Sequence, residues 1–188
     1  RRLERETFAL QGMYRTMSTA TNVTAQAVNT IEWLSASGTT IVVPVYQRQY
    51  RWDIGGCEKL LADVRAVAAS NDAHTHFIGS ILSSESTAVT TGPDDVAELV
   101  LIDGQQRITT LMLLVAALHH TVRADNPVLA AELERVLVRA SDPHRTKLRP
   151  HRAWAEVFEK VVLEKTGEHE ARDSRFDDNY AFFRSQIR

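Results

Sequence analysis

The sequence predicts an α+β fold in which a small sheet comes first and a set of helices follows. Three runs of apolar or β-branched residues, at 39–43, 76–83 and 98–102, have the length of strands. After residue 104, apolar residues recur in four successive segments at the three- and four-residue spacing of amphipathic helices. A chain of 188 residues is long enough to bury a sizeable core under this arrangement.

Two elements are expected before residue 44. A helix over about 24–35 has an apolar face, and Gly38 stands where that helix would stop. Residues 39–43 are all β-branched, which favours a strand. Pro44 closes this strand, because proline cannot donate a hydrogen bond to a sheet ladder.

A second helix is expected over 54–69, where the apolar residues follow helical spacing and Asp53 is placed as the N-cap. The single cysteine, Cys57, falls on the apolar face of this helix. We therefore expect a small core residue rather than a reactive thiol. One cysteine also excludes an internal disulfide and a cysteine-based zinc site.

A hairpin is expected next in the chain. Its first strand, at 76–83, contains Gly79, which allows another backbone to approach closely. A polar loop at 84–97 connects it to the second strand, at 98–102.

Helices are expected to form the rest of the chain. We place them at about 105–122, 127–140, 153–165 and 176–187, with Pro127 in the first turn of the second. The last pattern runs to the end of the sequence without a cap, which indicates a fragment of a longer protein.

Composition narrows the class of protein. With 44% apolar and 24% charged residues the chain is typical of globular proteins, and its net charge of −2 means that any nucleic-acid contact must come from a local patch. The longest apolar run, at 108–118, is too short to span a bilayer, and no secretory segment is recognisable. We therefore expect a cytoplasmic protein without membrane contact.

The segment VYQRQYRWD, which directly follows the 39–43 strand, is the first candidate for a site. Arg48 and Arg51 offer planar guanidinium groups that suit phosphate oxygens. Tyr46, Tyr50 and Trp52 alternate in sequence, so in an extended chain they would share one face that can stack a base. The alternative is a solvated loop whose aromatic rings cover the core and whose arginines form ion pairs.

The second candidate is DGQQR, where an apolar strand ends and a helix begins. Free backbone N–H groups and the helix dipole favour an anion at such a helix start. The positive charge of Arg107 in the first turn opposes the dipole, and a bound anion would offset this repulsion. Gly104 supplies the turn, Gln105 and Gln106 can donate and accept hydrogen bonds, and Asp103 could hold Mg²⁺ or orient a water. The alternative is an Asp103 N-cap with exposed amides, which leaves the other three residues unexplained.

Two further segments carry weaker signals. His74 and His76 would share a face in extended structure, but no Cys or Glu lies at a familiar ligand spacing, so we expect no metal site. The two remaining interpretations are that His76 contacts a phosphate or a base, or that the two histidines are a plain surface pair.

A basic run at 139–152 carries five Lys or Arg against one Asp. It is the best local candidate for a nucleic-acid backbone contact, with a solvated linker as the alternative.

Three ordered motifs, VPVYQRQYRW, HFIGSIL and LIDGQQRITTLMLL, resemble the N-terminal domain of modification-dependent restriction factors of the GmrSD type. The similarity covers roughly 31–120. It implies a small mixed sheet of the ParB/sulfiredoxin type followed by a helical bundle. The implied organisation is a tail or extension at 1–23, the ParB/sulfiredoxin-like domain at 24–124 and a helical part at 125–188, with the chain truncated before a nuclease domain.

The resemblance also implies a function. Domains of this kind bind and hydrolyse a nucleoside triphosphate, sense modified DNA and control an HNH-type nuclease domain further along the same chain. Within the family the chain looks most like the SspE-like subgroup, which restricts phage alongside phosphorothioate marking of DNA. GTP is then the first candidate among the triphosphates, with Mg²⁺ as a further cofactor candidate. The implied partners are phosphorothioate-modified double-stranded DNA and the nuclease domain, and a homo-oligomer stays open.

The resemblance and the residues together give a set of candidate site residues. Candidates for catalysis are Asp103, Gln105, Gln106 and Arg107. Candidates for nucleotide binding are Gly104, Arg48, Arg51 and Thr109. Candidates for DNA sensing are Tyr46, Gln47, Tyr50, Trp52 and His76. A sulfur-substituted phosphate is less hydrated than an ordinary one, so an apolar wall that includes Tyr46 would favour it.

Two other functions stay open at this point. A ParB-like module that binds DNA without hydrolysis would use the basic run at 139–152. A fold that itself nicks DNA would need Asp103 as a metal ligand, and one acidic residue is few for two-metal chemistry.

Overall fold

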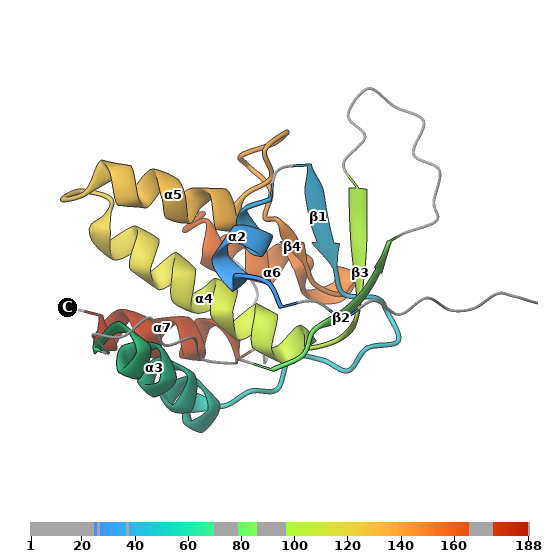
Figure 1. Ribbon diagram of the computed structural model, residues 1–188, viewed down its shortest axis with the longest axis horizontal. Coiled ribbons are helices and arrows are strands. Elements are labelled where there is room, and N and C mark those ends of the chain that lie inside the picture. The colour runs from blue at the N-terminus through green and yellow to red at the C-terminus, as the bar shows by residue number, and fades with distance from the viewer. Residues whose placement is uncertain are drawn as a thin grey trace, which may run out of the picture.

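Four short strands and six helices make up the part of the chain that the computed structural model describes, which is residue 25 and residues 27–36, 38–69, 79–85, 97–165 and 175–187. The helices are α2 (Thr30–Ser35), α3 (Ile54–Ala69), α4 (Gln105–Val122), α5 (Pro127–Leu137), α6 (Arg152–Val162) and α7 (Phe176–Gln186). The strands are β1 (Thr39–Val42), β2 (Leu82–Glu85), β3 (Ala97–Asp103) and β4 (Leu148–Arg149). The predicted α+β class, with a small mixed sheet and helices in the C-terminal half, is confirmed (Figure 1).

The sheet has the order β2-β3-β1-β4, and three of its strands run parallel. Strand β1 pairs in parallel with both β3 and β4, whereas β2 runs antiparallel to β3. Ile41 of β1 lies opposite Leu99 on one side and Leu148 on the other. The carboxyl ends of β1, β3 and β4 therefore meet at the same edge, which is where ligands bind in sheets with parallel strands.

Helix α4 forms the centre of the core. Residues 108–117 of this helix are buried without interruption, as expected of a helix that is apolar on all sides. It contacts α5, α6 and α7, and Figure 1 shows it running from the sheet edge between α5 and α7. Among the helices that the structure describes, none combines the length and apolar character that crossing a membrane would require.

Helix α3 begins as predicted. The Asp53 carboxylate accepts a hydrogen bond from the Gly56 backbone N–H at 3.1 Å, so Asp53 caps the first turn. Cys57 is fully buried, and this burial raises the pKa of its thiol to about 11. The expectation of an unreactive core cysteine is confirmed.

Several predicted boundaries are wrong. Helices α5 and α6 end at Leu137 and Val162, three residues before the predicted ends at 140 and 165. Helix α2 begins at Thr30 rather than near residue 24. The Asn29 side chain caps the helix there, because its Oδ1 accepts hydrogen bonds from the backbone N–H groups of Ile31 and Glu32. Among the described residues, the strand expected at 76–83 runs from Leu82 to Glu85. Gly79 has a φ of +105°, which a strand does not allow, and residues 76–78 lie outside the described part of the chain.

A polar network at the far end of α4 holds α7 in place. The Tyr180 hydroxyl donates to Glu164 at 2.8 Å, and the His120 Nδ1 lies 2.8 Å from the same hydroxyl. Because the phenol has one hydrogen, the His120 Nδ1–H donates to the Tyr180 oxygen. Arg123 forms an ion pair with Glu164 at 2.8 Å, and Glu164 has a φ of +46°. Several contacts therefore hold this residue in a backbone conformation that non-glycine residues rarely adopt.

Stability is expected to decrease in mild acid because of His120. Burial lowers the pKa of His120 to about 4, below its ordinary value of 6.5. Between these two values the unfolded chain binds a proton that the folded chain does not, so the free energy of unfolding falls as the pH drops from about 6.5 towards 4. At about 1.4 kcal/mol per pKa unit, the loss is at most about 3 to 4 kcal/mol.

Urea unfolding at several pH values measures this effect. His120→Asn should show a shallower dependence on pH than the unchanged protein. Part of the dependence should persist, because burial also lowers the pKa of His119. His144→Asn, at an exposed histidine, is the matched control. Equal slopes in the two variants would contradict the assignment.

Candidate functional site

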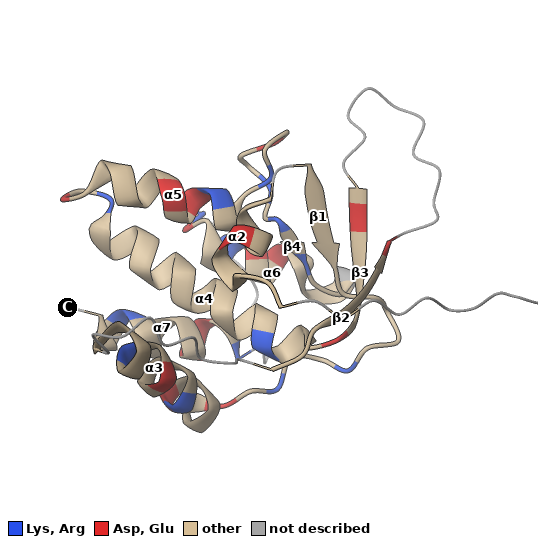
Figure 2. Cartoon of the chain, in the orientation of Figure 1, with Lys and Arg blue, Asp and Glu red and all other residues tan. Residues whose placement is uncertain are grey.

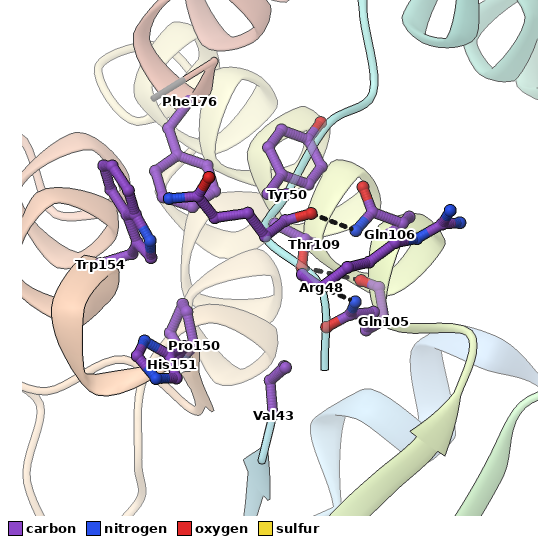
Figure 3. A pocket seen from close by; sticks show the side chains of 11 residues that line it. Val43, Arg48, Tyr50, Gln105, Gln106, Thr109, Pro150, His151, Trp154 and Phe176 are labelled. Atoms are coloured by element: carbon purple, nitrogen blue, oxygen red, sulfur yellow. Dashed lines mark hydrogen bonds between the residues drawn. The ribbon is translucent and has the colours of Figure 1, made fainter. Parts of the chain in front are cut away.

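The segments that follow the three parallel strands form a cleft at their common edge. Its empty space is about 310 Å³, part of which is open to solvent. The lining residues come from the loop after β1, the first turns of α4, the segment after β4 with α6, and the start of α7 (Figure 3). They are Val43, Arg48, Gln49, Tyr50, Gln105, Gln106, Thr109, Pro150, His151, Trp154 and Phe176.

Two buried amide side chains of α4 hold the loop after β1. Gln105 donates to the Arg48 carbonyl at 2.7 Å. Gln106 donates to the Gln49 carbonyl at 3.0 Å and accepts from the Arg51 N–H at 2.8 Å. Both glutamines are more than 90% buried, so the exposed amides of the alternative interpretation are not observed. The backbone of residues 48–51 depends on these contacts for its position.

Tyr50 connects the same loop to the core and to α7. The Asn179 amide donates to the Tyr50 oxygen at 2.7 Å, and the Tyr50 hydroxyl lies 2.8 Å from the Thr110 hydroxyl. The Tyr50 ring stacks on Phe176 with 5.1 Å between the ring centroids. Burial raises the pKa of the Tyr50 phenol, so the group stays neutral and serves as a hydrogen-bonded anchor.

The expectation that Tyr46, Tyr50 and Trp52 share one face is wrong. Tyr46 is 72% exposed, whereas Tyr50 and Trp52 pack against the core. The alternation holds only in an extended chain, and the loop instead turns where the Gln47 N–H donates to the Pro44 carbonyl at 3.1 Å. The core-covering alternative is therefore correct for Tyr50 and Trp52.

The start of α4 has no side-chain cap. Its N-cap residue is Gly104, with a φ of +90°, and Asp103 is the exposed last residue of β3. The Asp103 cap of the alternative interpretation is therefore not observed. A Cβ on Gly104 would lie 3.2 Å from the Ile81 side chain, so both the conformation and the space favour glycine. The first N–H groups of α4 have no capping side chain, as an anion site at a helix start requires.

Arg107 lies on the β2 side of this helix start and is half-buried. Its guanidinium donates to the Ser80 carbonyl at 3.1 Å. A Cβ on Gly79 would lie 2.6 Å from the guanidinium carbon, so the glycine leaves the space that Arg107 occupies. Within the described ranges no carboxylate forms an ion pair with Arg107, which leaves its charge available to an anion.

The other predicted residues lie at different places around the cleft. Arg48 is exposed and lines it, and Thr109 lines it while its hydroxyl donates to the Gln105 carbonyl at 2.8 Å. Gln47 donates to the Ile102 carbonyl at 2.7 Å and ties the loop to β3. The exposed Arg51 does not line the cleft, and its carbonyl accepts from Arg175 at 3.0 Å. His76 lies outside the described residues.

The basic run at 139–152 is not a free cationic surface. Arg145 and Arg149 form ion pairs with Glu159 and Glu98, at 3.2 and 2.6 Å. Lys147 is buried and donates to the Ala36 carbonyl. Figure 2 shows basic and acidic residues interspersed over the described elements. Most of the positive charge in this run is therefore used inside the fold.

The sequence analysis missed His151, Trp154 and Phe176 as cleft residues, and it also named none of Val43, Gln49 and Pro150 as a candidate. His151 and Trp154 follow β4, which has only two residues and therefore no recognisable strand pattern. Phe176 reaches the cleft from the first turn of α7. No signal in the sequence links these positions to DGQQR.

The described part of the chain contains no group of three or more His, Cys, Asp or Glu side chains that could hold a metal ion. Any metal at this site would therefore need ligands from a bound molecule or from water.

Comparison with known families gives one match. The family described as "GmrSD restriction endonuclease, N-terminal domain" matches residues 30–187, a range that includes every lining residue of the cleft. A comparison with curated proteins gives no match.

Gln105 and Gln106 are expected to act as a clamp: their amides should hold the backbone of residues 48–51 in place even when no ligand is bound. Gln106→Ala leaves the Arg51 N–H and the Gln49 carbonyl without their partner, at a cost of about 1–3 kcal/mol. Hydrogen exchange of the Arg51 amide should become at least about fivefold faster, since each 1.4 kcal/mol of lost protection is a factor of ten. Gln186→Ala, at an exposed glutamine of α7, is the control. Unchanged protection of the Arg51 amide in Gln106→Ala would contradict the clamp.

Proposed function

The chain belongs to the family of GmrSD restriction endonuclease N-terminal domains, and on that premise we propose that it is a regulatory nucleoside triphosphatase. As a member, it is a module of restriction proteins. In the proposed function it binds and hydrolyses a triphosphate, with GTP as the first candidate, and senses modified double-stranded DNA. The two events together control an HNH-type nuclease domain of the same protein.

The start of α4 is the observation that carries the proposal. An uncapped helix start with its dipole favours phosphate, and Gly104 lets a ligand approach the backbone closely. Arg107 adds a guanidinium that no described carboxylate neutralises. Because phosphoryl transfer depends mainly on positioning and charge stabilisation, these groups suit the triphosphate of a nucleotide.

The neighbouring residues take supporting roles in this proposal. Arg48 lies beside the two glutamines, and Figure 3 shows its side chain extending past them, away from Trp154. We assign Gln105 and Gln106 as positioning residues, because their amides hold the backbone from which Arg48 extends.

Asp103 is the residue that would hold Mg²⁺ here. Mg²⁺ commonly binds through one or two carboxylates together with substrate phosphates and waters, so a single exposed carboxylate at the strand end fits an ion that arrives with the nucleotide. Such an ion would neutralise charge on the phosphate oxygens. Without it, Asp103 can still orient an attacking water by accepting its hydrogen bond.

Loss of Arg107 is expected to abolish phosphate release from a folded protein. Arg107→Ala removes the charge that stabilises the transferring phosphoryl group, and the rate should fall at least about 100-fold. The measurement is phosphate release with each of the four common triphosphates, with and without phosphorothioate-marked duplex. Arg123→Ala, at the far end of α4, is the control for loss of an arginine. Hydrolysis that survives in Arg107→Ala would overturn the assignment, and nucleotide binding without hydrolysis in the unchanged protein would favour the ParB-like DNA-binding module.

An exposed apolar patch supports the DNA-sensing part of the proposal. Val45 and Tyr46 are more than 70% exposed at the tip of the loop after β1, and Ile102 and Leu82 are exposed on the adjacent strands. The hydrogen bond from Gln47 to the Ile102 carbonyl brings loop and strand together. A weakly hydrated sulfur on the DNA backbone would lose little solvation against such a surface.

Removing the Tyr46 ring is expected to reduce the preference for modified DNA. Tyr46→Ala should bind plain duplex as the unchanged protein does, and should lose several-fold in affinity for a matched phosphorothioate duplex. Competition binding with the two duplexes measures the preference. Val128→Ala, an equally exposed apolar side chain on α5, is the control. The same preference in Tyr46→Ala and in the unchanged protein would end this part of the proposal.

A further inference from the structure

We propose that the cleft beside Trp154 binds a nucleobase, with Trp154 and His151 as the residues that recognise it. The inference rests on the proposed function, because a bound nucleotide would place its phosphates at the start of α4 and its base in the adjoining cleft. A base turned out of DNA has the same chemistry, and the experiment below separates the two sources.

Trp154 gives the cleft an aromatic ring on which a planar base can stack. This ring lines the cleft and is half-buried, whereas Tyr50 and the buried Phe176 stack on each other with an interplanar angle of 23°. Figure 3 shows Trp154 and His151 on one side of the cleft and Gln105 and Arg48 on the other. Bases stack on such rings whatever their sequence identity, since every base has a π-face.

Hydrogen-bond donors gather in the same cleft. His151 caps α6, and its Nδ1 accepts from the Ala153 N–H at 3.2 Å. In the neutral ring the proton therefore lies on Nε2, which becomes a donor. The Trp154 indole N–H can only donate. These two donors favour a base edge that presents carbonyl oxygen or ring nitrogen acceptors.

The position of the cleft fits a base joined to phosphates. Gln105 and Gln106 line the cleft and also form the first turn of α4. The phosphates of the same ligand would then extend past Arg48 to the helix start.

The test compares ligands with and without a base. Dissociation constants for GTP and ATP, and for inorganic tripolyphosphate as the base-free probe, are measured for the unchanged protein, Trp154→Ala and Trp154→Phe. We expect Trp154→Ala to weaken nucleotide binding at least about fivefold and to leave tripolyphosphate binding unchanged. Trp154→Phe, which keeps a ring, should recover most of the affinity. His151→Ser keeps a side chain that caps α6 but lacks the Nε2 donor, and should reduce the preference between GTP and ATP.

Several outcomes overturn the proposal. Equal weakening of nucleotide and tripolyphosphate would show a general effect on the fold. Unchanged binding of both nucleotide and duplex DNA in Trp154→Ala would show that no base enters the cleft. Weaker binding of duplex DNA alone would support the base site and assign its ligand to DNA. Trp33→Phe, at a tryptophan of α2 that does not line the cleft, is the matched control.

Two further measurements test the base site without substituting Trp154 and without relying on hydrolysis. In Trp33→Phe/Trp52→Phe, Trp154 is the one remaining tryptophan, and nucleotide but not tripolyphosphate should quench its fluorescence. Absence of quenching by nucleotide and by duplex would overturn the proposal without any change to Trp154. If the unchanged protein binds nucleotide but releases no phosphate, the proposed hydrolysis fails while the base site stands.

Discussion

The contact between two buried glutamines and the loop after β1 is the constraint on which the site depends. Gln105 and Gln106 lie in the first turn of α4, yet their amides bind backbone atoms of residues 48–51, more than 50 positions earlier in the chain. An amide can donate and accept at once, so one side chain replaces the backbone partners that a strand would supply. Arg48 and Tyr50 take their places because this stretch of backbone is held.

The sheet explains why these residues meet at all. Strands β1, β3 and β4 are parallel, so three segments that are distant in sequence emerge at one edge. The shortest strand, β4, has a large effect, because it directs residues 150–154 to the same edge as DGQQR. Because of this pairing, a segment that the sequence suggests to be a basic linker forms one wall of the cleft. Cationic side chains of this segment form ion pairs and a backbone hydrogen bond that hold the wall in place.

The sequence predicted the local features of this protein well and its long-range features poorly. Helices α4 and α7 were found by periodicity, and the N-cap of α3 by residue type, because each depends on neighbours within a few positions. The two motifs that meet at the cleft were also identified. The role of Gln105 and Gln106 could not be predicted, since it depends on partners brought by the fold. Trp154 and His151 were missed for the same reason, and Tyr50 and Trp52 were misjudged because their loop is not extended.

Consecutive side chains of α7 hold two distant parts of the molecule. Asn179 binds the Tyr50 hydroxyl and the Trp52 carbonyl beside the cleft, and Tyr180 joins the network of His120 and Glu164 at the other end of α4. Two neighbouring side chains of one helix therefore fix the loop beside the cleft and the last turns of α4 at the same time.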